Sequence, residues 1–133
     1  MQLYLVRHAE AASGDPDELR PLTAEGRQAA RELGRRLAAE GVRPDAVLTS
    51  PLLRARETAV ELARAAGLEA EPDERLAPGA NAEAVRAAAG ERGAGTVVVV
   101  GHQPDCGRIA AALTGGPEPA FPPAGVLAID LAE

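Results

Sequence analysis

Short apolar runs alternate along this chain with segments of helical periodicity. The clearest run covers residues 96–100, a threonine followed by four valines, and it is apolar on both faces of an extended strand. Such a run is typical of a strand buried inside a parallel sheet. Comparable runs cover residues 2–7, 46–49, 68–72 and 125–131. The alternation predicts an α/β fold, a three-layer α/β/α sandwich with a mostly parallel central sheet, formed as a single domain over residues 1–133.

The segments between these runs carry helix start and stop signals. The predicted helices cover residues 24–40, 51–66, 82–89 and 103–113. Thr23 and Asn81 are expected to cap the first and third helices with their side chains. Ser50 is expected to cap the second helix in the same way, because Pro51 follows it at the first helical position. Gln103 and the proline after it are expected to open the fourth helix.

Charged side chains stand where two of the strongest strands end. Arg7 and His8 end the first strand, and His102 follows the valine run. Ligands of open α/β sheets bind beyond the carboxyl ends of the strands, and an arginine beside a histidine suits a phosphoryl group. Arg54 would lie in the first turn of a helix, where the backbone amides favour an anion. Taken alone, however, an Arg-His pair is more typical of a surface charge and a hydrogen-bonded loop histidine.

Three stretches in a fixed order change that interpretation. They are Arg7-His8, then the pattern Ser-x-x-x-Arg-Ala-x-x-Thr from Ser50 to Thr58, and then Gly101-His102. Together they resemble the histidine phosphatase superfamily, which also contains the cofactor-dependent phosphoglycerate mutases. The short chain, its start at Met1-Gln2 and the stretch Arg20-Pro21-Leu22-Thr23 are similar to the SixA-type phosphohistidine phosphatases.

The resemblance implies a phosphoglycerate mutase-like fold. In that fold the two histidines lie side by side after adjacent parallel strands, and the closing strand runs antiparallel. The resemblance also implies a metal-independent phosphatase in which His8 attacks phosphorus and becomes a transient phosphohistidine. Arg7, Arg54 and a protonated His102 would hold the phosphoryl oxygens. Arg20, in the loop at residues 11–22, would either contact the phosphate or be a solvated charge.

Two further expectations concern metals and the leaving group. The alternative role for His8 and His102 is metal ligation, but no third ligand is apparent, so neither a metal nor another cofactor is expected. Where many relatives carry a glutamate that protonates an alcohol leaving group, this sequence places Ala77, with Glu74 three residues away. Such an acid typically contributes about a hundredfold or more for a poor leaving group. Phosphohistidine needs less help, since imidazole leaves readily once its ring is protonated.

These features favour a phosphohistidine phosphatase that acts on a phosphorylated protein. The short connections, without the lid insertion of the mutases, predict an open site that suits a protein side chain. The alternatives are a general small-molecule phosphomonoesterase of the same superfamily and a non-catalytic phosphoryl-binding module.

A net charge of −6 and only two aromatic residues argue against binding to nucleic acid. One cysteine and no apolar leader or long apolar run favour a cytoplasmic protein without membrane contact. The sequence carries no signal for a particular oligomeric state.

Overall fold

The computed structural model describes residues 1–93 and 95–131, and this part of the chain forms one five-stranded sheet. The strands are β1 (Gln2–Arg7), β2 (Ala46–Thr49), β3 (Ala70–Pro72), β4 (Thr96–Gly101) and β5 (Val126–Asp130), in the order β3-β2-β4-β1-β5. The first four strands run parallel, and β5 pairs antiparallel with β1. The expected adjacency of β1 and β4 and the antiparallel closing strand are both confirmed.

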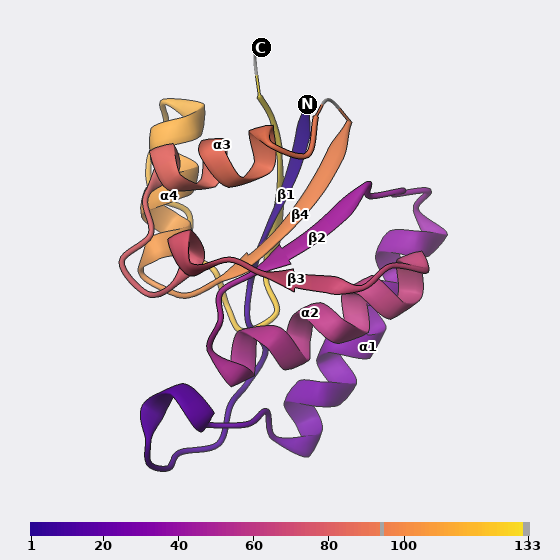
Figure 1. Cartoon of the computed structure of the whole chain (residues 1–133), viewed down its shortest axis with the longest axis vertical. Coiled ribbons are helices and arrows are strands. Elements are labelled where there is room, and N and C mark those ends of the chain that lie inside the picture. Colours follow the sequence, from indigo (N-terminus) through magenta and orange to yellow (C-terminus); the bar gives the residue numbers. More distant parts are fainter. Residues whose placement is uncertain (94, 132–133) are drawn as a thin grey trace.

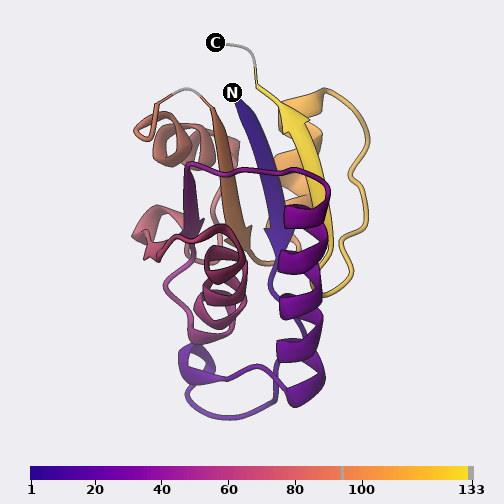
Figure 2. The same ribbon diagram turned by 90° about the vertical axis from the view of Figure 1, so that its right-hand side faces the viewer.

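Helices cover both faces of this sheet. The helices α1 (Ala24–Ala39) and α2 (Leu53–Ala66) pack on one face, and α3 (Ala82–Gly90) and α4 (Asp105–Thr114) pack on the other (Figures 1 and 2). The three-layer α/β/α prediction is therefore confirmed. No helix among residues 1–93 and 95–131 is long and apolar enough to cross a membrane.

The central strand β4 connects the two halves of the core. Its side chains alternate between the faces of the sheet, as the pleat of a strand requires. Val97 and Val99 pack with α3 and α4, whereas Val98 and Val100 pack with α1 and α2. All four valines are at most 2% exposed. Because burial of one such side chain contributes about 1.5–3 kcal/mol, the valine run favours a position for β4 in the middle of the sheet.

Two of the predicted helix starts are confirmed and two are displaced. Thr23 accepts a hydrogen bond from Gly26 N, and Asn81 accepts one from Ala84 N, as N-caps do. By contrast, α2 begins at Leu53 and α4 begins at Asp105, each two residues later than the sequence predicts.

The displaced start of α2 has a clear cause in Ser50. The backbone N–H of Ser50 still donates to the carbonyl of Val100 at 3.0 Å, so this residue prolongs the pairing of β2 with β4. Its side chain bonds to His102 Nε2 and accepts from Leu52 N, which precedes the first helical residue, Leu53. The prediction of Ser50 as a helix N-cap was wrong.

The carboxyl ends of β1, β2 and β4 meet at one edge of the sheet, and the loop at residues 8–23 extends from it. In Figures 1 and 2 this loop, in indigo, lies at the opposite end of the molecule from the N-terminus. Two contacts fix the loop against α1. Thr23 N donates to the carbonyl of Glu10 at 3.0 Å. Gly26 lies so close to the same carbonyl oxygen that an added Cβ would clash with it.

Candidate active site

Both histidines of the sequence lie at this edge of the sheet. Arg7 at the end of β1 pairs with Gly101 at the end of β4, so that the residue following each strand begins at the same level. The rings of His8 and His102 are 5.2 Å apart between centroids, with an interplanar angle of 61°. The backbone N–H of His8 donates to the Gly101 carbonyl at 2.9 Å, which fixes the start of the loop. The expected juxtaposition of the two rings is present.

The hydrogen bonding of His8 suits a nucleophile. Its Nδ1 lies 2.7 Å from the Ala9 carbonyl oxygen, and because a carbonyl can only accept, Nδ1 carries the proton. In the neutral ring the lone pair is therefore on Nε2. Burial lowers the pKa of His8 below its usual value, and the nearby charges of Arg54 and Arg7 lower it further, while the bond to Ala9 opposes the shift. A neutral His8 with a free Nε2 lone pair is consistent with attack on phosphorus.

The state of His102 differs from the sequence-based expectation of a protonated ring. Its Nε2 lies 2.7 Å from Ser50 Oγ, and the residue is only 5% exposed. Burial lowers its pKa to about 4, with smaller contributions from His8 and Arg54. The ring is therefore neutral near pH 7 in the ligand-free protein. A bound phosphoryl dianion would favour the charged form and oppose this shift.

Arg7 combines one satisfied and one unsatisfied donor. Its Nη1 donates to the carbonyl of Phe121 at 2.8 Å, which holds the guanidinium against the connection between α4 and β5. Its Nε is buried and has no hydrogen-bond partner among the described residues. The same is true of Nδ1 of His102.

Arg54 is the second residue of α2, and Thr58 connects its backbone to Ala9 in the loop after β1. Arg54 is 7% exposed, which is unusual for an arginine. Thr58 Oγ1 donates to the Arg54 carbonyl at 2.9 Å and accepts from Ala9 N at 3.0 Å. One buried hydroxyl thus links the residue next to His8 with the backbone of Arg54.

Arg20 and Asp17 form a cluster with Arg54. Arg20 Nε donates to the Ala12 carbonyl at 2.8 Å, and its Nη1 lies 3.0 Å from Asp17 Oδ1. Arg54 donates to the Asp17 carbonyl at 2.9 Å and to Asp17 Oδ2 at 3.2 Å. Arg20 is half-buried, and its hydrogen bonds are to residues of its own loop. Its charge also lowers the pKa of His8.

Three other predicted positions lie on α2 and on the turn that follows β3. Arg56 is exposed on α2. Ala77 is half-buried at the end of a 3₁₀ turn at Glu74–Leu76, and the Glu74 side chain is exposed. Within the part of the chain that the structure describes, no group of three or more His, Cys, Asp or Glu side chains could hold a metal ion.

Three residues at this edge were given no catalytic or binding role by the sequence. Ser50 was interpreted as a helix cap, Thr58 was only one letter of a motif, and Asp17 was part of a loop. For Thr58 a signal existed, because a threonine four residues after Arg54 on a helix can bond back to its carbonyl. For Asp17 and Ser50 the partners are 37 and 52 residues away in sequence, and no local pattern points to them.

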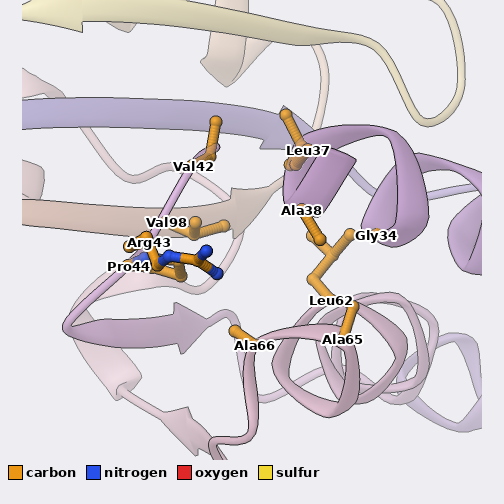
Figure 3. Close-up of a pocket in the computed structure, with 10 residues that line it drawn as sticks. All are labelled: Gly34, Leu37, Ala38, Val42, Arg43, Pro44, Leu62, Ala65, Ala66 and Val98. Atoms are coloured by element: carbon orange, nitrogen blue, oxygen red, sulfur yellow. The ribbon is translucent and has the colours of Figure 1, made fainter. Parts of the chain in front are cut away.

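A separate hollow of about 120 Å³ lies between α1, α2 and the connection that leads into β2 (Figure 3). It is formed by Leu37 on α1, Leu62 and Ala66 on α2, and Val42 and Arg43 on the connection that leads into β2. Since this connection precedes β2, whereas Ser50 follows it, the hollow is not part of the candidate active site.

Comparison with known proteins agrees with this arrangement. A family model described as the histidine phosphatase superfamily (branch 1) matches residues 3–78. The phosphohistidine phosphatase SixA of Escherichia coli (strain K12) is 34% identical over 125 residues, which cover 90% of this chain and 78% of that protein. An uncharacterized protein of Picosynechococcus sp. is 40% identical over 124 residues, covering 87% of this chain and 74% of its own length. A solved structure of the protein histidine phosphatase SixA complexed with tungstate matches with a TM-score of 0.90 and 32% identity, covering 98% of this chain and 88% of the other.

Proposed function

Because the chain belongs to the histidine phosphatase superfamily (branch 1), we propose that it removes the phosphoryl group from a phosphohistidine side chain of another protein. As an enzyme of this superfamily it is metal-independent and works through a phosphohistidine intermediate. The similarity to SixA over 90% of the chain supports phosphohistidine as the substrate. The similar SixA that binds tungstate, a tetrahedral oxyanion, supports an oxyanion site in this chain as well.

The observation that carries the proposal is a pair of buried nitrogen atoms. Among the described residues, Arg7 Nε and His102 Nδ1 are buried and lack hydrogen-bond partners. An unpaired buried polar group destabilises a fold by about 1–3 kcal/mol, and such exceptions are typical of ligand or catalytic sites. Arg7 precedes His8 and His102 packs on its ring. Unused hydrogen-bonding capacity on the residue before His8 and on the ring that packs against His8 favours an oxygen-rich ligand at this histidine.

In the first step His8 acts as the nucleophile. Its Nε2 lone pair forms a bond to phosphorus while the P–N bond to the substrate ring breaks. The substrate ring, protonated on its other nitrogen, takes the bonding electrons and leaves as neutral imidazole. The carbonyl of Ala9 holds the Nδ1 proton of His8 and stabilises the positive charge that its ring gains. In the second step water attacks phosphorus, the bond to Nε2 breaks, and the proton of the water goes to phosphate or solvent.

Arg7 and Arg54 are proposed to stabilise the phosphoryl oxygens in both steps. Arginine is suited to this role because its planar fork can contact two oxygens and remains charged at any physiological pH. In phosphoryl transfer the equatorial oxygens carry the developing charge, so fixed cations there lower the barrier without a proton transfer. His102, neutral in the free protein, is proposed to donate a hydrogen bond to the same group.

The need of the leaving group for a proton distinguishes the proposed phosphohistidine phosphatase from a general phosphomonoesterase. Ala77 stands where many relatives have an acid, so an alkyl alcohol would leave without a proton donor from that position. Phosphohistidine carries its own proton on the ring. The proposal therefore predicts a large preference for phosphohistidine over alkyl phosphates.

The test compares turnover of a phosphohistidine-containing protein with turnover of phosphoserine and sugar phosphates, at one pH. The expected result is efficient release of phosphate from the first and weak activity on the others. His8→Ala should remove all turnover while circular dichroism shows an unchanged fold, and acid-labile phosphate should be trapped on the wild-type protein alone. Equal activity on alkyl phosphates would favour a general phosphomonoesterase. Binding without turnover of any substrate would favour a phosphoryl-binding module.

A further inference from the structure

The carboxylate of Asp17 forms ion pairs with Arg20 and Arg54. Asp17 begins the 3₁₀ turn Asp17–Leu19 in the loop that follows His8. Its Oδ1 lies 3.0 Å from Arg20 Nη1 and its Oδ2 lies 3.2 Å from Arg54 Nη2. Its side chain is 60% exposed, whereas that of Arg54 is 9% exposed. The carboxylate is thus at the mouth of the site, on the outer side of a buried cation.

The charge of Asp17 extends into the site. Hydrogen bonds from Arg20, together with the charge of Arg54, hold the pKa of this carboxyl below its usual value, so that it is ionised at neutral pH. Its negative charge also raises the pKa of His102, against the larger effect of burial. The adjacent Glu18 is exposed in the same turn and has no such contact with either arginine.

We propose that Asp17 is a specificity-determining residue that selects substrates by the charge next to their phosphoryl group. Its carboxylate accepts from one terminal nitrogen of Arg54 and repels a second negative group at the mouth of the site. Arg7 and the remaining N–H groups of Arg54 attract the phosphoryl oxygens. A phosphorylated imidazole, whose ring is neutral or positive, meets no such repulsion. Phosphate esters that carry a carboxylate or a second phosphate do. Selection against a competitor by like charge is a common route to specificity.

This inference rests on the proposed function for its choice of favoured substrate, but its test does not. The matched variants are Asp17→Asn and Glu18→Gln, which remove one negative charge each from neighbouring positions of the same turn. The measured quantity is the ratio of kcat/KM for two activated aryl phosphates that differ only in a ring carboxylate. Both compounds release a phenolate. The comparison therefore does not depend on whether phosphohistidine is a substrate.

Asp17→Asn should raise the kcat/KM of the carboxylated aryl phosphate relative to its neutral counterpart by about tenfold, the effect of one pKa unit of interaction. Glu18→Gln should change this ratio less than twofold. The backbone carbonyl of Asp17, which accepts from Arg54 at 2.9 Å, is retained in both variants. If Asp17→Asn lowers both activities equally, the carboxylate only positions Arg54 and the proposal is overturned, as it is by an unchanged ratio.

A binding measurement covers the case of an inactive variant. Calorimetry with the same two aryl phosphates and the His8→Ala protein, with and without Asp17→Asn, gives the ratio of affinities without turnover. The proposal requires that the ratio move toward the carboxylated compound. Failure of phosphohistidine as a substrate would instead overturn the proposed function and leave this ratio unaffected.

Discussion

Ser50 Oγ lies 2.7 Å from Nε2 of His102, and both residues are almost completely buried. Ser50 Oγ also accepts from Leu52 N at 3.2 Å, so its own proton is available to Nε2. If the hydroxyl donates to Nε2, the imidazole proton is on Nδ1, the nitrogen that has no partner among the described residues. We therefore propose that the serine after β2 sets the tautomer of the histidine after β4.

Ser50→Ala should therefore lower kcat more than it changes KM. One hydrogen bond contributes about 0.5–1.5 kcal/mol, which corresponds to roughly a two- to twelvefold loss when the Ser50 hydroxyl no longer bonds to His102. Ser13→Ala, in the exposed part of the loop, is the control and should leave both constants unchanged. A variant whose kcat equals that of the wild type would mean that this contact does not matter for the reaction.

The pH dependence of the enzyme should follow the two depressed histidine pKa values. Because His8 must be neutral to attack, kcat/KM should rise with pH and level off below the usual histidine value of 6.5. Protonation of His102, with its pKa near 4, is confined to more acidic solutions. NMR is a direct test, since the chain contains only two histidines. A ring that titrates above 6.5 in the ligand-free protein would contradict the structure.

The same pKa shifts predict a loss of stability in acid. A histidine whose folded pKa is lowered binds its proton more readily in the unfolded chain. Stability therefore falls as pH decreases below 6.5, and for His102 it continues to fall until pH reaches about 4. Denaturant midpoints measured between pH 7 and pH 4 should decrease, and a His102→Gln variant should show a shallower decrease over that interval.

Arg54 and Arg56 are two residues apart on α2 and test which side of the helix faces the phosphate. Arg54 is 7% exposed beside the site, whereas Arg56 is exposed to solvent. Hydrogen bonds to charged groups contribute about 1.5–3 kcal/mol, so Arg54→Ala should lower kcat/KM at least about tenfold. Arg54→Lys should restore only part of it, because lysine lacks the fork. An Arg56→Ala protein as impaired as Arg54→Ala would show that the assignment of the two faces is wrong.

Thr58 should matter for stability as well as for activity. Thr58→Val keeps the volume but leaves Ala9 N buried without its acceptor, which typically destabilises a protein by about 1–3 kcal/mol. Thr114 is a matched control: its hydroxyl also donates to the carbonyl four residues earlier, at 2.8 Å, but it lies at the exposed end of α4. In denaturant unfolding, Thr114→Val should lower the free energy of unfolding by well under half as much as Thr58→Val does. Only Thr58→Val should lower kcat.

The elements of the fold could be predicted because their signals are local. The bounds of β1 and β2 match the apolar runs at 2–7 and 46–49, and the valines of β4 predict burial on both faces without any knowledge of neighbours. The positions of Arg7, His8 and His102 at the carboxyl edge of the sheet follow from these strands. The adjacency of β1 and β4, which brings the two histidines together, was implied by the resemblance to the superfamily.

The contacts within the site could not be predicted in the same way. Ser50 followed by a proline fits a helix cap as well as it fits a histidine partner, and only the pairing of β2 with β4 decides between them. The neutral state of His102 depends on burial, which a polar residue at a strand end does not reveal. The contact of Asp17 with Arg54 closes a loop of 37 residues and has no periodic signature.

The last prediction concerns Ala77 and is the most direct test of the substrate class. Ala77 follows the 3₁₀ turn Glu74–Leu76 and is half-buried, while Glu74 itself is exposed. If position 77 corresponds to the acid of the relatives, Ala77→Glu should raise kcat on alkyl phosphates by roughly tenfold or more, since general acid catalysis contributes about a hundredfold when its geometry is ideal. The kcat on an aryl phosphate, whose phenolate leaves without a proton, should change little.

Glu74→Gln is the companion variant, because it removes the carboxyl group of the turn Glu74–Leu76. It should leave the activity on alkyl phosphates as low as in the wild type. If Glu74→Gln abolishes an alkyl phosphatase activity that the wild type already has, Glu74 is the proton donor, and the preference for phosphohistidine loses its chemical basis. If Ala77→Glu leaves the activity on alkyl phosphates unchanged and Glu74→Gln also has no effect, position 77 does not correspond to the acid of the relatives. The preference for phosphohistidine would then require a different explanation. The contacts of Asp17 with Arg20 and Arg54 support one, namely the negative charge of Asp17 at the mouth of the site.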